Sequence, residues 1–235
     1  MKKIISPNPQ AVAEQFAQDF AQWVNESNGP VHVALSGGST PKILFKVWAS
    51  NDCPKTDWSK VHFYWGDERC VPPNDSESNY GVTNQLFFQP AKISESNIHR
   101  VLGENDPETE SDRYAKVICD QIPATNGLPH FDVMILGMGT DGHTASIFPN
   151  QMDFMNESDF CAVATHPESG QKRVTLTGPV IRQSKRIAFL ITGASKFPVL
   201  NAIETETKES KTWPATLFLL ADTTRVYLDK DAAGQ

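Results

Sequence analysis

An aspartate and a histidine stand two residues apart in a glycine-rich segment that follows an apolar run. The run covers 133–136, and the segment contains Asp141 and His143 among the glycines Gly137, Gly139 and Gly142. Imidazole titrates near neutral pH, so a histidine beside a carboxylate is suited to accept a proton. The pattern predicts a loop at the end of a buried strand where Asp141 and His143 are suited to move a proton, although a structural histidine is the alternative.

The same glycines also match the G-x-G-x-x-G pattern of dinucleotide-binding proteins. That motif needs a long helix after its third glycine, because the helix N-terminus holds the pyrophosphate. Pro149 follows too closely and would end or kink such a helix. Asp141 would also place a negative charge beside the diphosphate. The sequence therefore disfavours a nicotinamide cofactor, and we expect no cofactor.

A second loop combines glycines and hydroxyl side chains after the apolar segment 31–35. Its glycines permit close approach of backbone N–H groups to a ligand, and its hydroxyls add donors. Pro41 is suited to the first position of a helix, whose N-terminus would then point at the loop. The sequence predicts a phosphate-binding loop, although a ligand-free capping turn is the alternative. Its members are Gly37, Gly38, Ser39 and Thr40.

Two further segments place charged residues after apolar runs. Asp67 and Arg69 follow 61–65 and suit contacts with hydroxyl groups or a phosphate, or they form a surface ion-pair cluster. Lys196 follows 187–192 and adds a positive charge to the same rim, unless it is an ordinary surface lysine. The six histidines show no metal-binding spacing, so no metal is expected.

Composition limits the classes of partner and compartment. The 235 residues carry a net charge of −7, which argues against nucleic-acid and anionic-membrane partners. No apolar run is long enough to span a bilayer. The four cysteines are scattered without a C-x-x-C pair, as is typical of reduced thiols in the cytoplasm. We expect one domain over 1–235, forming a monomer or a small homo-oligomer.

Helical and strand patterns alternate along the chain. This alternation predicts an α/β protein, a Rossmann-like three-layer α/β/α arrangement with a mainly parallel sheet. The segments 66–78 and 103–111 are expected to be polar connections. Expected helices are 9–24, 41–49, 79–88, 112–122 and 195–204. Expected strands or extended segments are 31–35, 61–65, 131–136, 160–165, 173–177, 187–192, 217–220 and 225–228.

Several motifs, taken in order and spacing, resemble the 6-phosphogluconolactonase family. They are Ser36-Gly37-Gly38-Ser39-Thr40-Pro41, Gly66-Asp67-Glu68-Arg69 with Ser78-Asn79, the segment Leu136 to Pro149, Arg173-Val174-Thr175-Leu176-Thr177 and Gly193-Ala194-Ser195-Lys196. The resemblance runs from near residue 30 to near residue 230. The related glucosamine-6-phosphate deaminases carry an acidic residue before the proline, where this chain has Phe148, and Asp-Glu-Tyr where it has Asp-Glu-Arg. Both differences favour the lactonase.

The resemblance implies a glucosamine-6-phosphate deaminase-like fold and a phosphorylated sugar lactone as ligand. The implied reaction converts 6-phospho-D-glucono-1,5-lactone to 6-phospho-D-gluconate in the oxidative pentose phosphate pathway. His143 would activate water as the general base, and Asp141 would orient its ring. Asp67 would position sugar hydroxyls, and Arg69 or the glycine-loop N–H groups would bind the oxyanion. The implied phosphate ligands are Ser39, Thr40, Arg173 and Lys196. Glucosamine-6-phosphate deaminase activity and a non-catalytic sugar-phosphate sensor are the alternatives.

Overall fold

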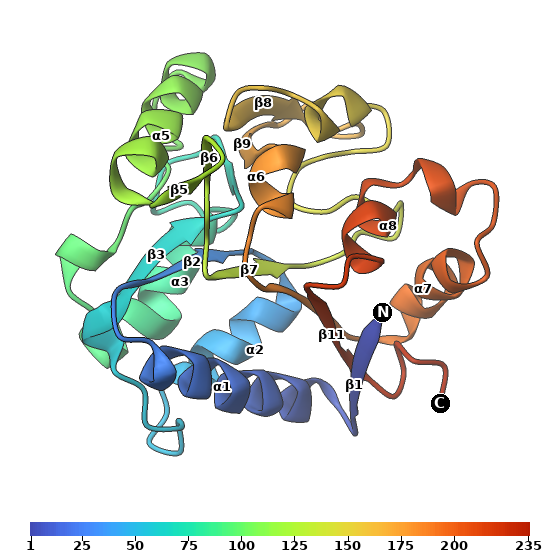
Figure 1. Ribbon diagram of the computed structural model, residues 1–235, viewed down its shortest axis with the longest axis horizontal. Coiled ribbons are helices and arrows are strands. Elements are labelled where there is room, and N and C mark those ends of the chain that lie inside the picture. Colours follow the sequence, from blue (N-terminus) through green and yellow to red (C-terminus); the bar gives the residue numbers. More distant parts are fainter.

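A computed structural model describes residues 1–235 and contains a six-stranded sheet with helices on both faces (Figure 1). Every neighbouring pair of strands in this sheet is parallel, which confirms the expected mainly parallel sheet. Its spatial order is β1 (Lys2–Ser6), β11 (Thr224–Asp229), β10 (Ile187–Ile191), β7 (Val133–Leu136), β2 (Val31–Leu35) and β3 (Val61–Trp65).

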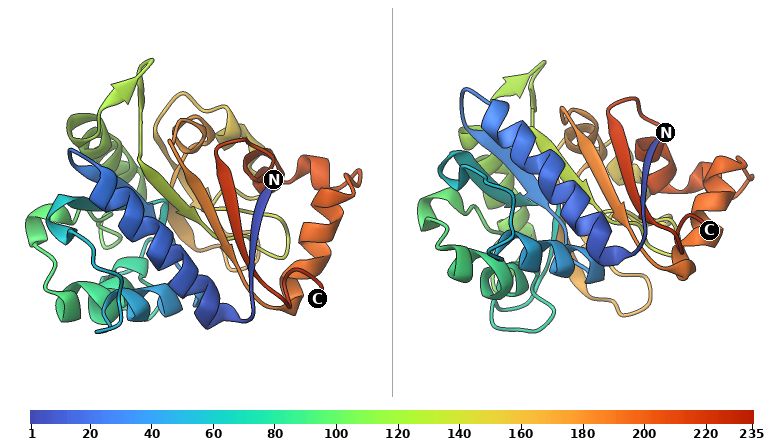
Figure 2. Two further views of the ribbon diagram at one scale, coloured as in Figure 1. Left: turned by 60° about the horizontal axis from the view of Figure 1, so that its bottom comes forward. Right: turned by 90° about the horizontal axis from the view of Figure 1, so that it is seen from below.

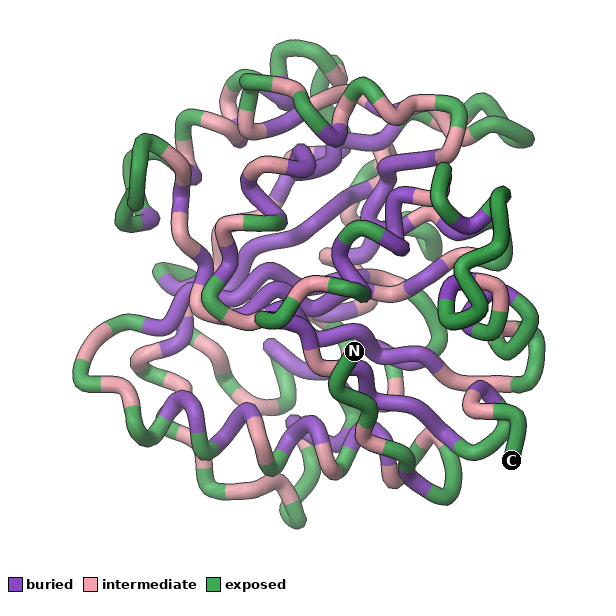
Figure 3. Tube along the Cα trace, turned by 45° about the vertical axis from the view of Figure 1, so that its right-hand side comes forward, coloured by how far each residue is buried: buried purple, intermediate pink, exposed green.

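Alternate side chains of each central strand enter different cores. In β2, Val33 and Leu35 face one core and Ala34 faces the other. The buried strands therefore form the middle layer, as Figure 3 shows. The first core is covered by α1 (Pro9–Glu26) and α2 (Ser39–Trp48). The second is covered by α5 (Pro107–Gln121), α6 (Gly178–Arg182), α7 (Phe197–Glu204) and α8 (Pro214–Leu219). No helix has the length and apolar character needed to cross a bilayer.

A three-stranded antiparallel sheet lies beside the main sheet and positions part of the cavity described below. Its order is β4 (Asp67–Arg69), β9 (Lys172–Leu176) and β8 (Cys161–Thr165), with Asp67 opposite Thr175 and Arg69 opposite Arg173. The hairpin β5 (Ala124–Thr125) and β6 (Leu128–Pro129) completes the sheets. The remaining helical segments are η1 (Trp58–Lys60), α3 (Asn79–Thr83), the π-helical η2 (Asn84–Phe88), α4 (Gln89–Ala91), η3 (Glu95–Asn97), η4 (Met152–Met155), η5 (Ala194–Lys196) and η6 (Ser210–Thr212).

Two expected elements are corrected by the structure. Residues 217–219 of the expected strand belong to helix α8, and Leu220 is its C-cap. Ala215, Phe218 and Leu219 are buried with helical spacing, and Pro214 occupies the helix start. The connection 103–111 is only partly solvated. Helix α5 begins at Pro107, and the Glu110 carboxylate is buried in an ion pair with Arg113.

Three further differences from the sequence-based expectations concern β1, the start of α2, and the segment 66–78. Strand β1 was not predicted, and it pairs only with β11 at the edge of the sheet (Figure 2). Helix α2 begins at Ser39, so Pro41 is its third residue rather than its first. Gly38 takes the N-cap position with φ of 113°, a left-handed conformation that favours glycine. The segment 66–78 likewise contains the strand β4.

Three histidines and a tyrosine stack between β2, β3 and the segment after η3. The His62 Nδ1 lies 3.1 Å from the His99 Nε2, and the His32 Nδ1 lies 3.3 Å from the Tyr64 hydroxyl. The Tyr64 and His99 rings are nearly parallel, with centroids 4.5 Å apart. Burial lowers the pKa of each of the three imidazoles, that of His99 to about 4. The cluster therefore favours neutral rings.

We expect this cluster to make the fold sensitive to acid. Unfolded histidines bind protons near pH 6.5, before the folded cluster does, so stability falls as pH drops from about 6.5 towards 4. From pH 7.5 to 5, His99 lowers the free energy of unfolding by about 1 kcal/mol, after allowance for solvent screening. Thermal unfolding at both pH values gives the change in melting temperature between them. This change should be smaller for His99→Gln than for the wild type, whereas His130→Gln should keep the wild-type change. Equal differences in all three proteins would contradict the expectation.

Candidate active site

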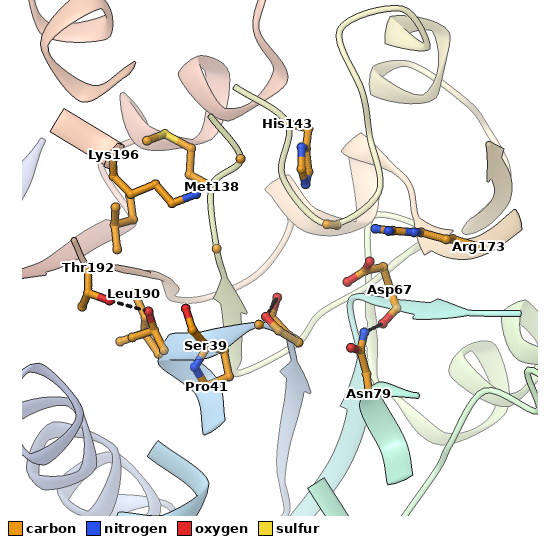
Figure 4. Close-up of a pocket in the computed structure, with 18 of the residues that line it drawn as sticks. Ser39, Pro41, Asp67, Asn79, Met138, His143, Arg173, Leu190, Thr192 and Lys196 are labelled. Atoms are coloured by element: carbon orange, nitrogen blue, oxygen red, sulfur yellow. Dashed lines mark hydrogen bonds between the residues drawn. The ribbon is translucent and has the colours of Figure 1, made fainter. Parts of the chain in front are cut away.

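A polar cavity opens where the carboxyl ends of β2, β7 and β10 approach the β4–β9 edge (Figure 4). This is the side of a parallel sheet on which ligands bind. All sequence-predicted site residues except Asp141 line the cavity. These are Gly37, Gly38, Ser39, Thr40, Asp67, Arg69, His143, Arg173 and Lys196. The structure therefore brings together four loops that are far apart in the chain.

Asp141 contacts His143 from outside the cavity lining. Its Oδ1 lies 2.6 Å from the Nδ1 of His143 and also accepts the His143 backbone N–H at 3.2 Å. Burial opposes ionisation of Asp141, but the hydrogen bond and charge of His143 outweigh it and lower the pKa to about 2. An ionised acceptor at Nδ1 places the imidazole hydrogen there. The Nε2 is then left free to accept a proton.

The glycines of this loop make room for the Asp141–His143 pair. A Cβ on Gly139 would lie 2.2 Å from the His143 Nδ1 and 2.3 Å from the Asp141 Oδ1. Gly142 has φ of 80°, and its missing Cβ would collide with the Trp213 side chain. The chain then continues through a turn to the 3₁₀ helix η4, so the pyrophosphate-binding helix of the dinucleotide motif is not formed. Steric constraints therefore explain two glycines of the G-x-G-x-x-G match, Gly139 and Gly142.

The buried ring of Phe148 packs against the His143 imidazole. Its centroid lies 4.8 Å from that of His143, and His166 packs edge-on against it at 5.3 Å. The Arg173 guanidinium carbon lies 5.8 Å from the same ring, within cation–π range. Phe148 is fully buried and has no ionisable group. It therefore fixes the imidazole by packing and supplies no proton.

The loop formed by Gly37, Gly38, Ser39 and Thr40 lines the cavity opposite His143 (Figure 4). The N-cap Gly38 starts α2, whose first N–H groups lack partners within the helix. The Thr40 hydroxyl is 2.7 Å from that of Thr192, which ties the loop to the end of β10. A Cβ on Gly37 would lie 1.9 Å from the Asn79 Oδ1, so only glycine fits there. The arrangement has the geometry expected for binding an anion.

Three cations and one carboxylate give the cavity its charge pattern. Burial lowers the pKa of Lys196, while the charge of Asp141 opposes this shift. Burial likewise lowers the pKa of Arg173, and the charge of Asp67 opposes it. Arg69 donates through Nη1 to the backbone oxygen of Glu77 at 2.7 Å. A cavity with this many cations attracts an anionic ligand despite the net charge of −7.

The middle residue of the Asp67–Arg69 segment has a structural role. The Glu68 carboxylate is buried and accepts the backbone N–H groups of Asn79 and Tyr80 at 2.8 and 2.7 Å. Burial raises the pKa of Glu68 to about 7, while these backbone hydrogen bonds oppose the shift. Glu68 therefore holds the start of α3 against β4, with the flanking Asp67 and Arg69 facing the cavity.

Three further cavity or support residues were missed as site residues. Asn79 donates through Nδ2 to the Asp67 backbone oxygen at 2.9 Å, and Thr192 bonds Thr40. Ser146 donates to the Asp67 carboxylate at 2.6 Å. Thr192 was recognisable as the polar residue ending a buried strand. The partners of Asn79 and Ser146 depend on long-range contacts that no local pattern specifies.

Comparison with known proteins identifies the family. A family model described as glucosamine-6-phosphate isomerases/6-phosphogluconolactonase matches residues 7–227. A 6-phosphogluconolactonase of Haemophilus influenzae is 45% identical over 99% of this chain and 98% of its own length. The solved 6-phosphogluconolactonase of Trypanosoma brucei is 25% identical, with a TM-score of 0.86 over 99% of this chain and 97% of its own. A monomeric glucosamine-6-phosphate deaminase, 23% identical, shares the fold with a TM-score of 0.81 over 100% of this chain and 99% of its own. The chain thus belongs to the glucosamine-6-phosphate isomerase/6-phosphogluconolactonase family.

Proposed function

We propose that the protein hydrolyses 6-phospho-D-glucono-1,5-lactone to 6-phospho-D-gluconate, a step of the oxidative pentose phosphate pathway. The 45% identity to a named 6-phosphogluconolactonase, over nearly the full length of both chains, supports this substrate. The observation that carries the mechanism is the 2.6 Å contact between Asp141 and His143, with the histidine facing a cavity rich in cations. The pair supplies a general base, and the cations supply an anion site.

In the proposed reaction the Nε2 of His143 takes a proton from water as the water oxygen bonds to the lactone C1. The carbonyl oxygen becomes an oxyanion, which Arg69 or the glycine-loop N–H groups stabilise. The C1–O5 bond then breaks, and imidazolium returns the proton to O5. Asp141 remains ionised and stabilises the imidazolium. The released carboxylic acid loses its proton to solvent.

We assign the phosphate to Lys196, Arg173 and the loop containing Ser39 and Thr40. Two cations and free N–H groups at a helix N-terminus form a suitable phosphate site. Asp67 then serves as acceptor for a sugar hydroxyl. Phe148 disfavours deaminase chemistry, since its buried ring cannot exchange a proton.

A coupled assay tests the proposal directly. Formation of 6-phosphogluconate is followed through its dehydrogenase and corrected for spontaneous lactone hydrolysis. The expected result is turnover of the lactone with no ammonia released from glucosamine 6-phosphate. Ammonia release without lactone turnover would assign the deaminase reaction instead. Binding of either compound with no turnover of both would assign a sensor.

Lys196→Ala is expected to weaken substrate binding more than chemistry. Removing a charge-assisted hydrogen bond costs about 1.5–3 kcal/mol, which corresponds to a rise in KM of about 10- to 100-fold. The reason is that Lys196 contacts the non-reacting phosphate in both ground and transition states. Steady-state kinetics should show this rise with kcat nearly unchanged. Lys116→Ala, which removes an exposed lysine of α5, is the control. An unchanged KM for Lys196→Ala would exclude the assignment.

We further propose that the chain acts as one domain over 1–235, as a monomer or small homo-oligomer in the cytoplasm. Both hydrophobic cores share the same central sheet, which supports a single unit. The scattered cysteines support a reducing compartment, and the net charge of −7 disfavours nucleic acid as a partner.

A further inference from the structure

A buried serine connects the two sides of the cavity. The Ser146 Oγ lies 2.6 Å from the Asp67 Oδ2, and the two residues are 79 positions apart in the chain. Ser146 is fully buried, and Asp67 is 5% exposed although it lines the cavity. The serine hydroxyl donates and the carboxylate oxygen accepts. The contact therefore occupies one carboxylate oxygen and leaves the other for a ligand.

The backbone of Ser146 is fixed as firmly as its side chain. Its N–H donates to the Thr175 hydroxyl at 3.1 Å. Thr175 is the β9 residue directly opposite Asp67 in the antiparallel register. The Thr175 hydroxyl in turn donates to the Leu176 backbone oxygen at 3.1 Å. One buried set of hydrogen bonds thus connects Asp67, Ser146 and Thr175, and the donor and acceptor of each bond are defined.

The same tight turn carries both Ser146 and the general base. Immediately after His143, the chain turns between Thr144 and Ile147, with the Ile147 N–H donating to the Thr144 oxygen at 3.0 Å. Ala145 within the turn has φ of 48°, a left-handed conformation uncommon for a residue with a Cβ. The Thr144 hydroxyl anchors the turn to the Gly137 oxygen at 2.8 Å. The position of Ser146 is therefore coupled to that of His143.

We propose that Ser146 is a positioning residue for the reaction, which fixes the Asp67 carboxylate relative to the His143 imidazole. This inference rests on the proposed function, because Asp67 matters here as the acceptor of a sugar hydroxyl. A sugar held by Asp67 presents its C1 at a set distance from the water on His143. Without the serine hydroxyl the Asp67 carboxylate is free to move, so the distance between the sugar C1 and the water on His143 varies. This lowers the rate at which the water attacks C1.

Ser146→Ala tests the proposal through kinetic parameters. We expect kcat to fall about tenfold, with KM changed by less than about threefold because the phosphate contacts remain. Ser184→Ala is the matched control. Ser184 is also buried, its hydroxyl has no partner, and its loss should leave both parameters at wild-type values. Thermal unfolding of each variant tests whether it is folded. If Ser146→Ala is unstable, Ser146→Cys keeps the volume with only a weak donor and should show the same loss.

A double-mutant cycle separates positioning from a general effect on folding. In an Asp67→Ala background, which has no acceptor for the serine hydroxyl, Ser146→Ala should change kcat less than about twofold. Equal losses in both backgrounds would overturn the proposal, as would wild-type kcat for Ser146→Ala. These comparisons require an active parent protein. A wild-type protein without lactone turnover would instead overturn the proposed function, and the inference with it.

Discussion

Replacing His143 by alanine is expected to lower kcat by about 10² to 10⁴, the range found when a general base is lost. The lactone and its phosphate contacts remain, so KM should change much less. The physical reason is that water is a poor nucleophile until a base removes its proton. In this cavity the imidazole is oriented for that task by the Asp141 carboxylate at 2.6 Å. The coupled lactone assay, corrected for spontaneous hydrolysis, measures the loss.

His166→Ala is the matched control for that experiment. His166 packs on the same Phe148 ring as His143, at 5.3 Å between centroids, but it does not line the cavity. Its removal tests whether packing around the ring alone accounts for the effect. We expect the kcat of this variant to stay near the wild-type value. A His143→Ala protein that keeps near wild-type turnover would remove His143 from the mechanism.

Gly139→Ala is expected to lower kcat by about 10² without adding or removing any ionisable group. The new Cβ would lie 2.2 Å from the His143 Nδ1 and 2.3 Å from the Asp141 Oδ1. Real Cβ contacts are never that short, so the pair must move apart or the loop must shift by about 1 Å. A misplacement of that size costs about 10² in rate. Steady-state kinetics and thermal unfolding together measure whether the loss is catalytic.

Gly29→Ala provides the comparison for this substitution. Gly29 lies between α1 and β2, and an added Cβ there meets no atom within 4 Å. Its kcat and melting temperature should stay near wild type. If Gly139→Ala also keeps wild-type kcat, the short Asp141–His143 contact is not required for catalysis. The role assigned to the glycine would then be wrong, even if His143 itself were essential.

Strands buried on both faces and long helices with one apolar face were predictable from sequence. β2, β7 and β10 read as apolar runs because both faces of a parallel sheet are covered. α8 was misread because a short run such as 217–220 fits a strand or a buried helix equally well. β1 was missed because four of its five residues are exposed or half-buried, which leaves no clear alternation.

The loops of the site were predictable, but their connections were not. Glycines after apolar runs mark such loops, and His143, Asp67 and Lys196 all line the cavity. The contact between Ser146 and Asp67 joins segments that only the folded β4–β9 sheet brings together. The 66–78 loop gave no strand signal, because β4 is three residues long and polar. Local patterns therefore identify reactive groups, while tertiary structure determines what orients them.

The pairing of β1 with β11 constrains the order in which the chain can fold during synthesis. Residues Lys2 and Ser6 align with Arg225 and Asp229, so β1 has no partner in the sheet until β11 has been made. Contacts of such large sequence separation carry a high loop-closure entropy and form slowly. Ribosome-bound chains should therefore leave the 2–6 segment accessible to proteases until residues 224–229 have emerged, well after the β2–β3 pair has formed.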